Sequence, residues 1–153
     1  MDIVKAKIAI VNEWGKILIL TRSQYEDTRQ GDPDLPGGSL ESYDITVADG
    51  LCREVDEELP GTTLRNITEL DQPHHKINEL GQLVITHVFA GWATLPLDGI
   101  RTSHEHEDET LWVPRIEVNA LKSIPGKYRR PIRDNPLVFE WLIKQAQDKL
   151  VAS

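Results

Sequence analysis

Runs of apolar residues separated by polar, turn-forming segments divide much of the chain into short strands. Residues 8–11 and 16–20 are aliphatic and β-branched, and the polar segment between them contains a glycine, which predicts a β-hairpin. Residues 83–92 are rich in β-branched and aromatic side chains and predict a long central strand, beside which we expect residues 66–70 to pair. Residues 111–113 predict a further strand that ends at the following proline.

Two other segments carry apolar residues at helical spacing. The first opens at a capping box formed by Thr46 and Asp49, and it ends at Pro60, which cannot continue a helix, and Gly61, which suits a left-handed conformation. The second covers residues 135–146 and begins with an Asn-Pro pair, which is typical of an N-cap and a first helical position. We interpret the second segment as a packing helix.

The first predicted helix has an apolar stripe beside an acidic stripe. At about 100° per residue, Leu51, Val55 and Cys52 share the apolar stripe, so we expect the Cys52 thiol to be buried and inert. The acidic stripe carries three carboxylates: Glu54, Glu57 and Glu58. Because the two stripes are adjacent, the acids are expected at the rim of the core, along the wall of a cleft.

Three carboxylates on one helical face repel one another, and the stripe does not supply an equal number of cations. A hard divalent cation such as Mg²⁺ offsets this repulsion, and it keeps coordination positions for water and phosphate. Residues 21–40, ahead of the helix, are polar and rich in glycine and proline, so we expect a loop that ends in a tight turn. Gly50 presents no side chain on the acidic stripe, which we interpret as space for a ligand.

Composition narrows the classes of function. The chain has 153 residues, which predicts a single domain over residues 1–153. With 17 basic and 25 acidic residues the formal charge is −8, which disfavours nucleic acid as the main partner. One cysteine excludes an internal disulfide, and the sequence shows neither a leader-like N-terminus nor an apolar run that could cross a membrane. We therefore expect a cytoplasmic protein without a membrane partner.

The glycine turn and the helix together resemble the signature of the Nudix hydrolases, enzymes that cleave a nucleoside diphosphate linked to another group. The positions that match in type and spacing are Gly38, Arg53, Glu54, Val55, Glu57 and Glu58. Between the glycine and the arginine the chain is one residue longer than the family pattern, so Asp44 or Ile45 stands where the family has a glutamate. We place the extra residue in the loop and treat Asp44 as the counterpart.

The resemblance implies an α/β/α sandwich with a mixed β-sheet, and a pyrophosphohydrolase that uses Mg²⁺, or Mn²⁺ in its place. Its implied metal ligands are Glu54, Glu57 and Glu58. Among these, Glu54 is expected to accept a proton from the attacking water as well. One more ligand is expected from the acidic segment before residues 111–113, with Glu109 as the first choice and Glu107 as the next.

Other residues are expected to support this chemistry. Arg53 lies one turn from Glu57, so the two are expected to pair at i,i+4 and to act together in catalysis. Arg22, at the end of the second predicted strand, is a candidate contact for a substrate phosphate. Gly37 and Gly38 allow the backbone to approach the helix, where their amides are expected to face the substrate.

The sequence leaves several alternatives open. The favoured substrate is a nucleoside triphosphate, intact or oxidised, followed by ADP-ribose and nucleotide sugars, in a monomer or a homodimer. A non-catalytic nucleotide-binding or sensor domain of the same fold is the main alternative, because of the altered first half of the signature. The 5′ end of RNA is a weaker candidate, given the net charge of −8. The acidic segment of residues 104–109 is equally compatible with a solvated surface loop.

Overall fold

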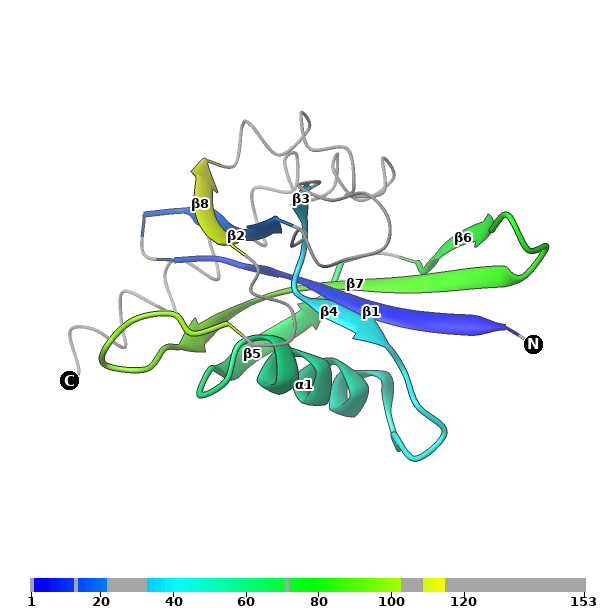
Figure 1. The fold of residues 1–153 in the computed structure, drawn as a ribbon, viewed down its shortest axis with the longest axis horizontal. Coiled ribbons are helices and arrows are strands. Elements are labelled where there is room, and N and C mark those ends of the chain that lie inside the picture. The colour runs from blue at the N-terminus through cyan, green and yellow to red at the C-terminus, as the bar shows by residue number, and fades with distance from the viewer. Residues whose placement is uncertain (1, 13, 22–32, 71, 103–108, 115–153) are drawn as a thin grey trace.

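The structure is a computed structural model that describes residues 2–12, 14–21, 33–70, 72–102 and 109–114. Within these ranges the chain forms eight strands and one α-helix. Figure 1 shows the helix α1 on one side of a long sheet, and the short strands β2, β3 and β8 on its other side. The predicted helix over residues 135–146 lies outside the described residues.

The larger sheet is mixed. Its strands are β1 (Ile3–Ile10), β4 (Gly37–Ser39), β5 (Thr63–Glu69), β6 (His74–Ile77) and β7 (Leu83–Thr94). The order is β4-β1-β7-β5, and β6 pairs with another part of β7. β1 and β7 run parallel, whereas the other pairs are antiparallel. The α/β class, the mixed sheet and the long central strand predicted from the sequence are therefore confirmed.

The smaller sheet is antiparallel. It has β2 (Lys16–Thr21) in the middle, between β3 (Pro33–Asp34) and β8 (Glu109–Pro114). The predicted hairpin between β1 and β2 holds only near its turn, where Val11 and Ile17 form an isolated bridge. Beyond that bridge the two strands enter different sheets, because β1 pairs with β7 while β2 pairs with β8.

The loop predicted for residues 21–40 contains two short strands, β3 and β4, so that prediction was wrong for this part of the segment. β4 pairs with β1 although it consists of two glycines and a serine. The pairing depends on the missing side chain of Gly37, whose φ is +130° and whose hypothetical Cβ would lie 2.0 Å from the Ala6 carbonyl oxygen. Composition alone indicates a turn here, because the partner that makes this segment a strand is distant in sequence.

The helix α1 (Val47–Glu58) begins and ends as the sequence predicts. The Thr46 hydroxyl accepts the Asp49 amide at 3.0 Å and so satisfies one of the free amides of the first turn. Leu59 is the C-cap, and Gly61 has a φ of +83°, the left-handed conformation that glycine adopts at low cost. No helix among the described residues has the length and apolar character needed to span a membrane.

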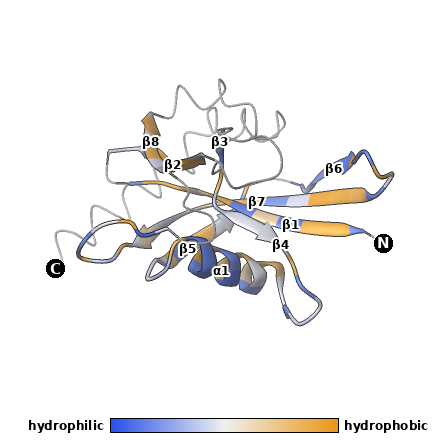
Figure 2. Ribbon diagram, viewed as in Figure 1, coloured by the Kyte–Doolittle hydropathy of each residue, from blue (hydrophilic) through white to orange (hydrophobic). Residues whose placement is uncertain are grey.

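Two apolar clusters hold the layers together (Figure 2). Leu51 and Val55 of α1 are fully buried against residues of the larger sheet that include Ile8 and Phe89. The second cluster lies between the two sheets, and its members include Ala9, Ile17, Ile19, Val88 and Val113. Successive residues of β1 thus enter different clusters, as the two faces of a strand require.

Cys52 is exposed, so the expectation of a buried thiol was wrong. Leu51, Val55 and Leu59 form the line of contact with the sheet, and Cys52 lies about 100° further round the helix than Leu51. The face of α1 that packs against the sheet is therefore narrower than the apolar face predicted from helical spacing. Partial desolvation and, to a lesser degree, the charge of Asp49 raise the pKa of the Cys52 thiol, which therefore stays protonated at neutral pH.

The contrast between neighbouring residues of α1 gives a test of this packing. We expect Leu51→Ala to lower the free energy of unfolding by about 2–5 kcal/mol, since it leaves a cavity in the core. Cys52→Ala is the matched control and should change the same quantity by less than about 0.5 kcal/mol, because the thiol is exposed. Urea unfolding followed by circular dichroism measures both. Equal losses in the two variants would contradict this orientation of the helix.

Candidate active site

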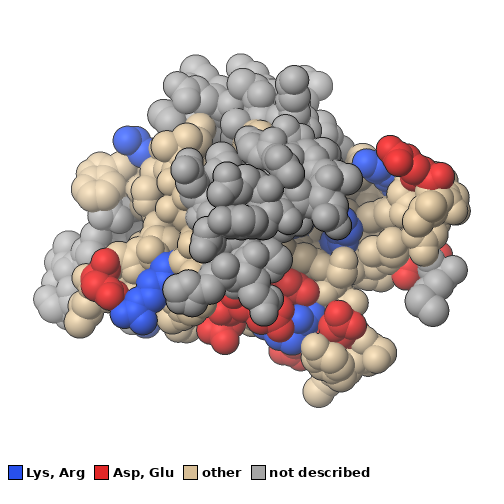
Figure 3. Space-filling view, viewed as in Figure 1, with Lys and Arg blue, Asp and Glu red and all other residues tan. Residues whose placement is uncertain are grey.

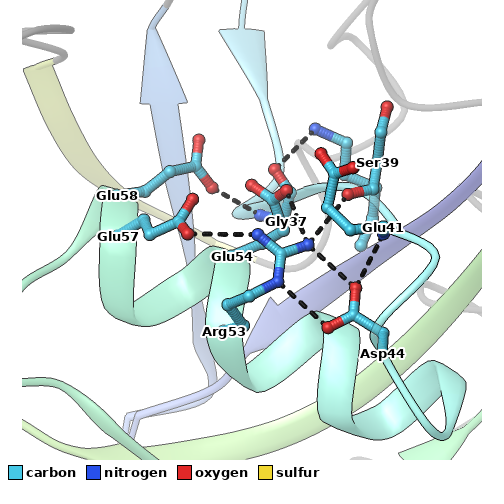
Figure 4. Close-up of polar contacts among 9 residues, drawn as sticks. Gly37, Ser39, Glu41, Asp44, Arg53, Glu54, Glu57 and Glu58 are labelled. Carbon is cyan, nitrogen blue, oxygen red and sulfur yellow. Dashed lines mark hydrogen bonds and ion pairs between the residues drawn. The ribbon is translucent and has the colours of Figure 1, made fainter.

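The acidic stripe of α1 lies against the two glycines of β4 (Figure 4). The Glu58 carboxylate accepts the Gly37 amide at 2.7 Å through its Oε1. A hypothetical Cβ on Gly38 would lie 2.5 Å from Oε2 of Glu54, so this carboxylate occupies space that any other residue at position 38 would fill. The backbone of β4 therefore holds the Glu58 carboxylate by a hydrogen bond and leaves room for the Glu54 carboxylate.

Arg53 connects the acids of the site. Its Nε and Nη2 donate to the two carboxylate oxygens of Asp44 at 3.0 and 2.9 Å, a bidentate arrangement. Nη1 donates to Glu57 Oε1 at 3.1 Å, which is the predicted i,i+4 pair. Nη2 also lies 3.2 Å from Glu54 Oε1 and donates to the Ser39 carbonyl oxygen at 3.1 Å. One cation thus orients three carboxylates.

Asp44, our candidate for the position where the family has a glutamate, provides a carboxylate that contacts Arg53. Its side chain is only 5% exposed, and besides Arg53 it accepts the Glu41 amide at 2.8 Å. The hydrogen bond from Arg53, followed by the one from the Glu41 backbone, holds the pKa of the Asp44 carboxyl below its ordinary value. Ile45, the other residue that could stand at this position, is 90% exposed just before the N-cap Thr46. Of the two, only Asp44 brings a carboxylate to the arginine.

Glu54 carries a charge that its surroundings do not fully compensate. Burial raises the pKa of its carboxyl most strongly, and the nearby Glu57 raises it further, while Arg53 and Lys7 oppose the change. Figure 3 shows this imbalance at the surface, where acidic atoms gather over α1 around a smaller basic group. A second cation beside Glu54 would stabilise its charged form.

The donor set fits a hard divalent cation. It consists of carboxylate oxygens, which Mg²⁺ and Mn²⁺ accept, and the raised pKa of Glu54 indicates a charge that such an ion neutralises. Within the part of the chain that is described, no three acidic, histidine or cysteine side chains converge closely enough to hold an ion as they lie. Binding by all three glutamates would therefore involve side-chain rotation, for which Glu57 is well placed, since its side chain is 59% exposed.

The remaining residues predicted for the site have different outcomes. Gly50 does not leave space for a ligand, because a Cβ there would meet the Leu40 side chain at 2.7 Å and Asp44 Oδ2 at 3.1 Å. That glycine instead lets the pre-helix loop pack on α1. Arg22 and Glu107 lie outside the described residues, and Glu109 is placed by its backbone alone, as the first residue of β8 opposite Thr21.

The sequence analysis missed Lys7 and Asp34. Lys7 Nζ donates to Asp34 Oδ2 at 3.0 Å and to the carbonyl oxygens of Leu35 and Gly37 at 3.3 Å each. The signal was present in the alternation along β1, because Lys7 shares a face with Ala9 and Val11, which are both buried. A lysine on the core-facing side of a strand needs a partner, which here is the segment ahead of β4.

Comparison with known proteins agrees with this geometry. A family model described as NUDIX domain matches residues 1–134. A solved MutT protein from Methanosarcina mazei Go1 is 28% identical, with a TM-score of 0.64 over 86% of this chain and 91% of that one. A MutT NUDIX hydrolase from Burkholderia pseudomallei is 23% identical, with a TM-score of 0.65 over 86% of this chain and 96% of that one. A comparison with curated proteins finds no match.

A third solved structure, an Ap4A hydrolase from C. elegans, shares the fold at 14% identity, with a TM-score of 0.65 over 90% of this chain and 98% of that one. The chain belongs to the Nudix family, which confirms the resemblance inferred from its signature, and it is a Nudix pyrophosphohydrolase. Enzymes of this family act on nucleoside diphosphate derivatives and generally use divalent metal ions.

The pair between Asp44 and Arg53 gives a test of the adapted signature. We expect Asp44→Asn to lower kcat/KM about 10-fold or more, because Arg53 loses the anchor that aligns it with Glu54 and Glu57. Asp56→Asn, an exposed change of the same kind on α1, should leave kcat/KM close to the wild-type value. Steady-state kinetics on a hydrolysed nucleotide measures the effect, and equal activities in both variants would argue against the anchoring role.

The same pair predicts a pH dependence of stability. Because the folded-state pKa of Asp44 is lowered, its carboxylate stabilises the fold above the ordinary value of 3.8, and this contribution is lost as pH falls through the lowered pKa. We therefore expect Asp44→Asn to reduce the urea midpoint at neutral pH, with the difference from wild type vanishing in strong acid. A constant difference at every pH would mean that the charge of Asp44 is not the cause.

For Glu54 we expect a pH dependence of stability opposite in sign to that of Asp44. Its pKa is raised in the folded state, so the stability it contributes is present below the ordinary value of 4.5 and is lost as pH rises through the raised pKa. In metal-free protein at neutral pH, we expect Glu54→Gln to raise the urea midpoint. Unfolding curves in EDTA, with Asp56→Asn as the control, measure this shift. A lower midpoint for Glu54→Gln would show that Arg53 already compensates the charge.

Proposed function

We propose that this Nudix enzyme hydrolyses the diphosphate linkage of a nucleoside triphosphate, intact or oxidised, with Mg²⁺ held by Glu54, Glu57 and Glu58. The observation that carries the proposal is the position of these carboxylates. They line one face of α1, where Glu58 accepts the Gly37 amide, Glu54 fills the space beside Gly38 and Glu57 pairs with Arg53. ADP-ribose and nucleotide sugars are the next substrate classes.

The chain's own residues would divide the work as follows. Glu54, Glu57 and Glu58 would bind the ion, and Glu54 would also accept a proton from the attacking water, since burial gives it a higher pKa than an ordinary glutamate. Arg53 would keep Glu54 and Glu57 aligned through its contacts at 3.2 and 3.1 Å. The ion, when bound, supplies positive charge for the phosphoryl oxygens and acidifies the attacking water.

Substrate contacts complete the proposal. We assign Arg22 and the backbone of Gly37 and Gly38 to the phosphate side of the site, and Glu109 to a further metal contact. The Gly37 amide is donated to Glu58 in this structure, so in this state it orients a proposed metal ligand, and a contact with phosphate would require that hydrogen bond to open. The net charge of −8 supports a small nucleotide bridged by a cation over a nucleic-acid partner.

The replacement of the family glutamate in the signature does not, in our interpretation, favour a non-catalytic sensor domain. That alternative rested on the replacement of a glutamate by Asp44 or Ile45. Asp44 reaches Arg53 with both oxygens, and Ile45 is accommodated in the loop, so the arrangement of the helix is preserved.

A panel assay tests the proposal. We expect the protein to hydrolyse at least one member of a panel of nucleoside triphosphates, oxidised triphosphates, ADP-ribose and nucleotide sugars. A triphosphate would give a nucleoside monophosphate and pyrophosphate, and ADP-ribose or a nucleotide sugar would give a nucleoside monophosphate and a sugar phosphate, all separated by chromatography. The activity should be lost in EDTA and restored by Mg²⁺ or Mn²⁺. Glu57→Gln should lower kcat/KM at least about 100-fold, because a metal ligand matters at least as much as the residues that orient it.

The controls separate activity from folding. Asp56→Asn changes an exposed carboxylate on the same helix and should retain full activity. Circular dichroism confirms that Glu57→Gln is folded, as expected for a side chain that is 59% exposed. Wild-type protein that binds nucleotides by calorimetry but turns over none of the panel would favour the sensor domain instead.

A further inference from the structure

A lysine on the core-facing side of β1 contacts one carboxylate and two backbone carbonyls around the glycine turn. Lys7 is only 15% exposed, and the neighbouring positions on its face, Ala9 and Val11, belong to the cluster between the sheets. Its ammonium group contacts Asp34 of β3, the Leu35 carbonyl and the Gly37 carbonyl. Lys7 therefore ties the segment that leads from β3 into β4 to the central strand of the larger sheet.

The three contacts use the full donor capacity of the lysine. An ammonium group has three N–H donors, and Lys7 has three acceptors at 3.0, 3.3 and 3.3 Å. In this arrangement it has no donor left for a substrate phosphate. Its position near the acidic stripe is thus explained by what it does to the protein backbone.

The backbone that Lys7 holds is the one that fixes Glu58. Gly37 accepts Lys7 through its carbonyl and donates its amide to Glu58 Oε1 at 2.7 Å. The carbonyl that Lys7 contacts belongs to the Gly37–Gly38 peptide, and the amide donated to Glu58 belongs to the Pro36–Gly37 peptide, whose carbonyl accepts the Ile8 amide at 2.9 Å. The two peptides meet at Gly37, whose φ is +130° and which lies directly against Ala6, so contacts on both sides restrain this glycine. A chain of contacts therefore runs from Asp34 through Lys7 and Gly37 to a carboxylate of the site.

We propose that Lys7 is a positioning residue: its ammonium group holds the Leu35 and Gly37 carbonyls on either side of the Pro36–Gly37 peptide, so that the Gly37 amide orients the Glu58 carboxylate for metal binding. The metal-binding part rests on the function proposed above, whereas the orientation of Glu58 does not.

An electrostatic role alone predicts the opposite effect on metal binding. A positive charge beside the acidic stripe repels a cation, and the charge of Lys7 partly opposes the rise in the pKa of Glu54 that burial causes. Removing that charge without any loss of positioning would tighten metal binding. Removing the positioning contact would weaken it, because Glu58 loses its fixed orientation. The sign of the change in metal affinity therefore distinguishes the two roles.

The test compares Lys7→Met with Lys76→Met in the full-length, metal-free protein. Methionine keeps much of the length of the lysine side chain and removes the charge, and Lys76 is exposed on β6 at the edge of the sheet. Two quantities are measured: the amide proton shift of Gly37 by ¹H–¹⁵N NMR, and the affinity for Mn²⁺ by electron paramagnetic resonance. We expect Lys7→Met to move the Gly37 amide upfield and to weaken Mn²⁺ binding about 10-fold or more. Lys76→Met should change neither.

The outcomes are separable. A wild-type Gly37 shift and unchanged or tighter Mn²⁺ binding in Lys7→Met would overturn the inference. If Lys7→Met does not fold, Asp34→Asn decides, because it removes the ion pair and leaves the acceptor of the Leu35 amide in place. That variant should move the Gly37 amide in the same direction by a smaller amount, and an unmoved signal overturns the inference. If the wild-type protein neither binds Mn²⁺ nor hydrolyses nucleotides, the proposed function fails, while the Gly37 shift still tests the positioning.

Discussion

The close approach of β4 to α1 is the constraint on which the site depends. Gly37 and Gly38 bring the backbone so near the helix that one donates its amide to Glu58 and the other leaves the space that Glu54 occupies. The approach is possible because the other side of β4 pairs with β1, which is anchored in turn by its parallel pairing with β7. The position of the carboxylates is thus set by the sheet as much as by the helix that carries them.

The site has more carboxylates than cations. Arg53 is the cation shared by Asp44, Glu54 and Glu57, and Lys7 is committed to the backbone on the opposite side of β1. Burial raises the pKa of the Glu54 carboxyl although Arg53 lies 3.2 Å away. A carboxylate with a raised pKa beside other acids is typical of functional sites, where a bound cation completes the charge balance.

Local signals predicted the elements that depend on neighbouring residues. The cap at Thr46, the end of α1 near Gly61, and the central position of β7 follow from residue types within each segment. The prediction was wrong where the partner is distant in sequence. The sequence predicted a turn at β4 and a buried thiol at Cys52, and both predictions were wrong. Whether a segment pairs as a strand, and how wide a face of a helix is buried, depends on the sheet against which it lies.

The sequence by itself determined the family, the acidic face of α1 and the i,i+4 pair of Arg53 with Glu57, since these depend on spacing along one helix. Only the tertiary structure decided that the Asp44 carboxylate meets Arg53, that Ile45 is exposed before the helix, and that Lys7 contacts the backbone of the turn. These three facts join residues of separate elements. Their contacts depend on how a loop and two strands meet in space. The spacing of residues along the chain does not give the distances between these elements.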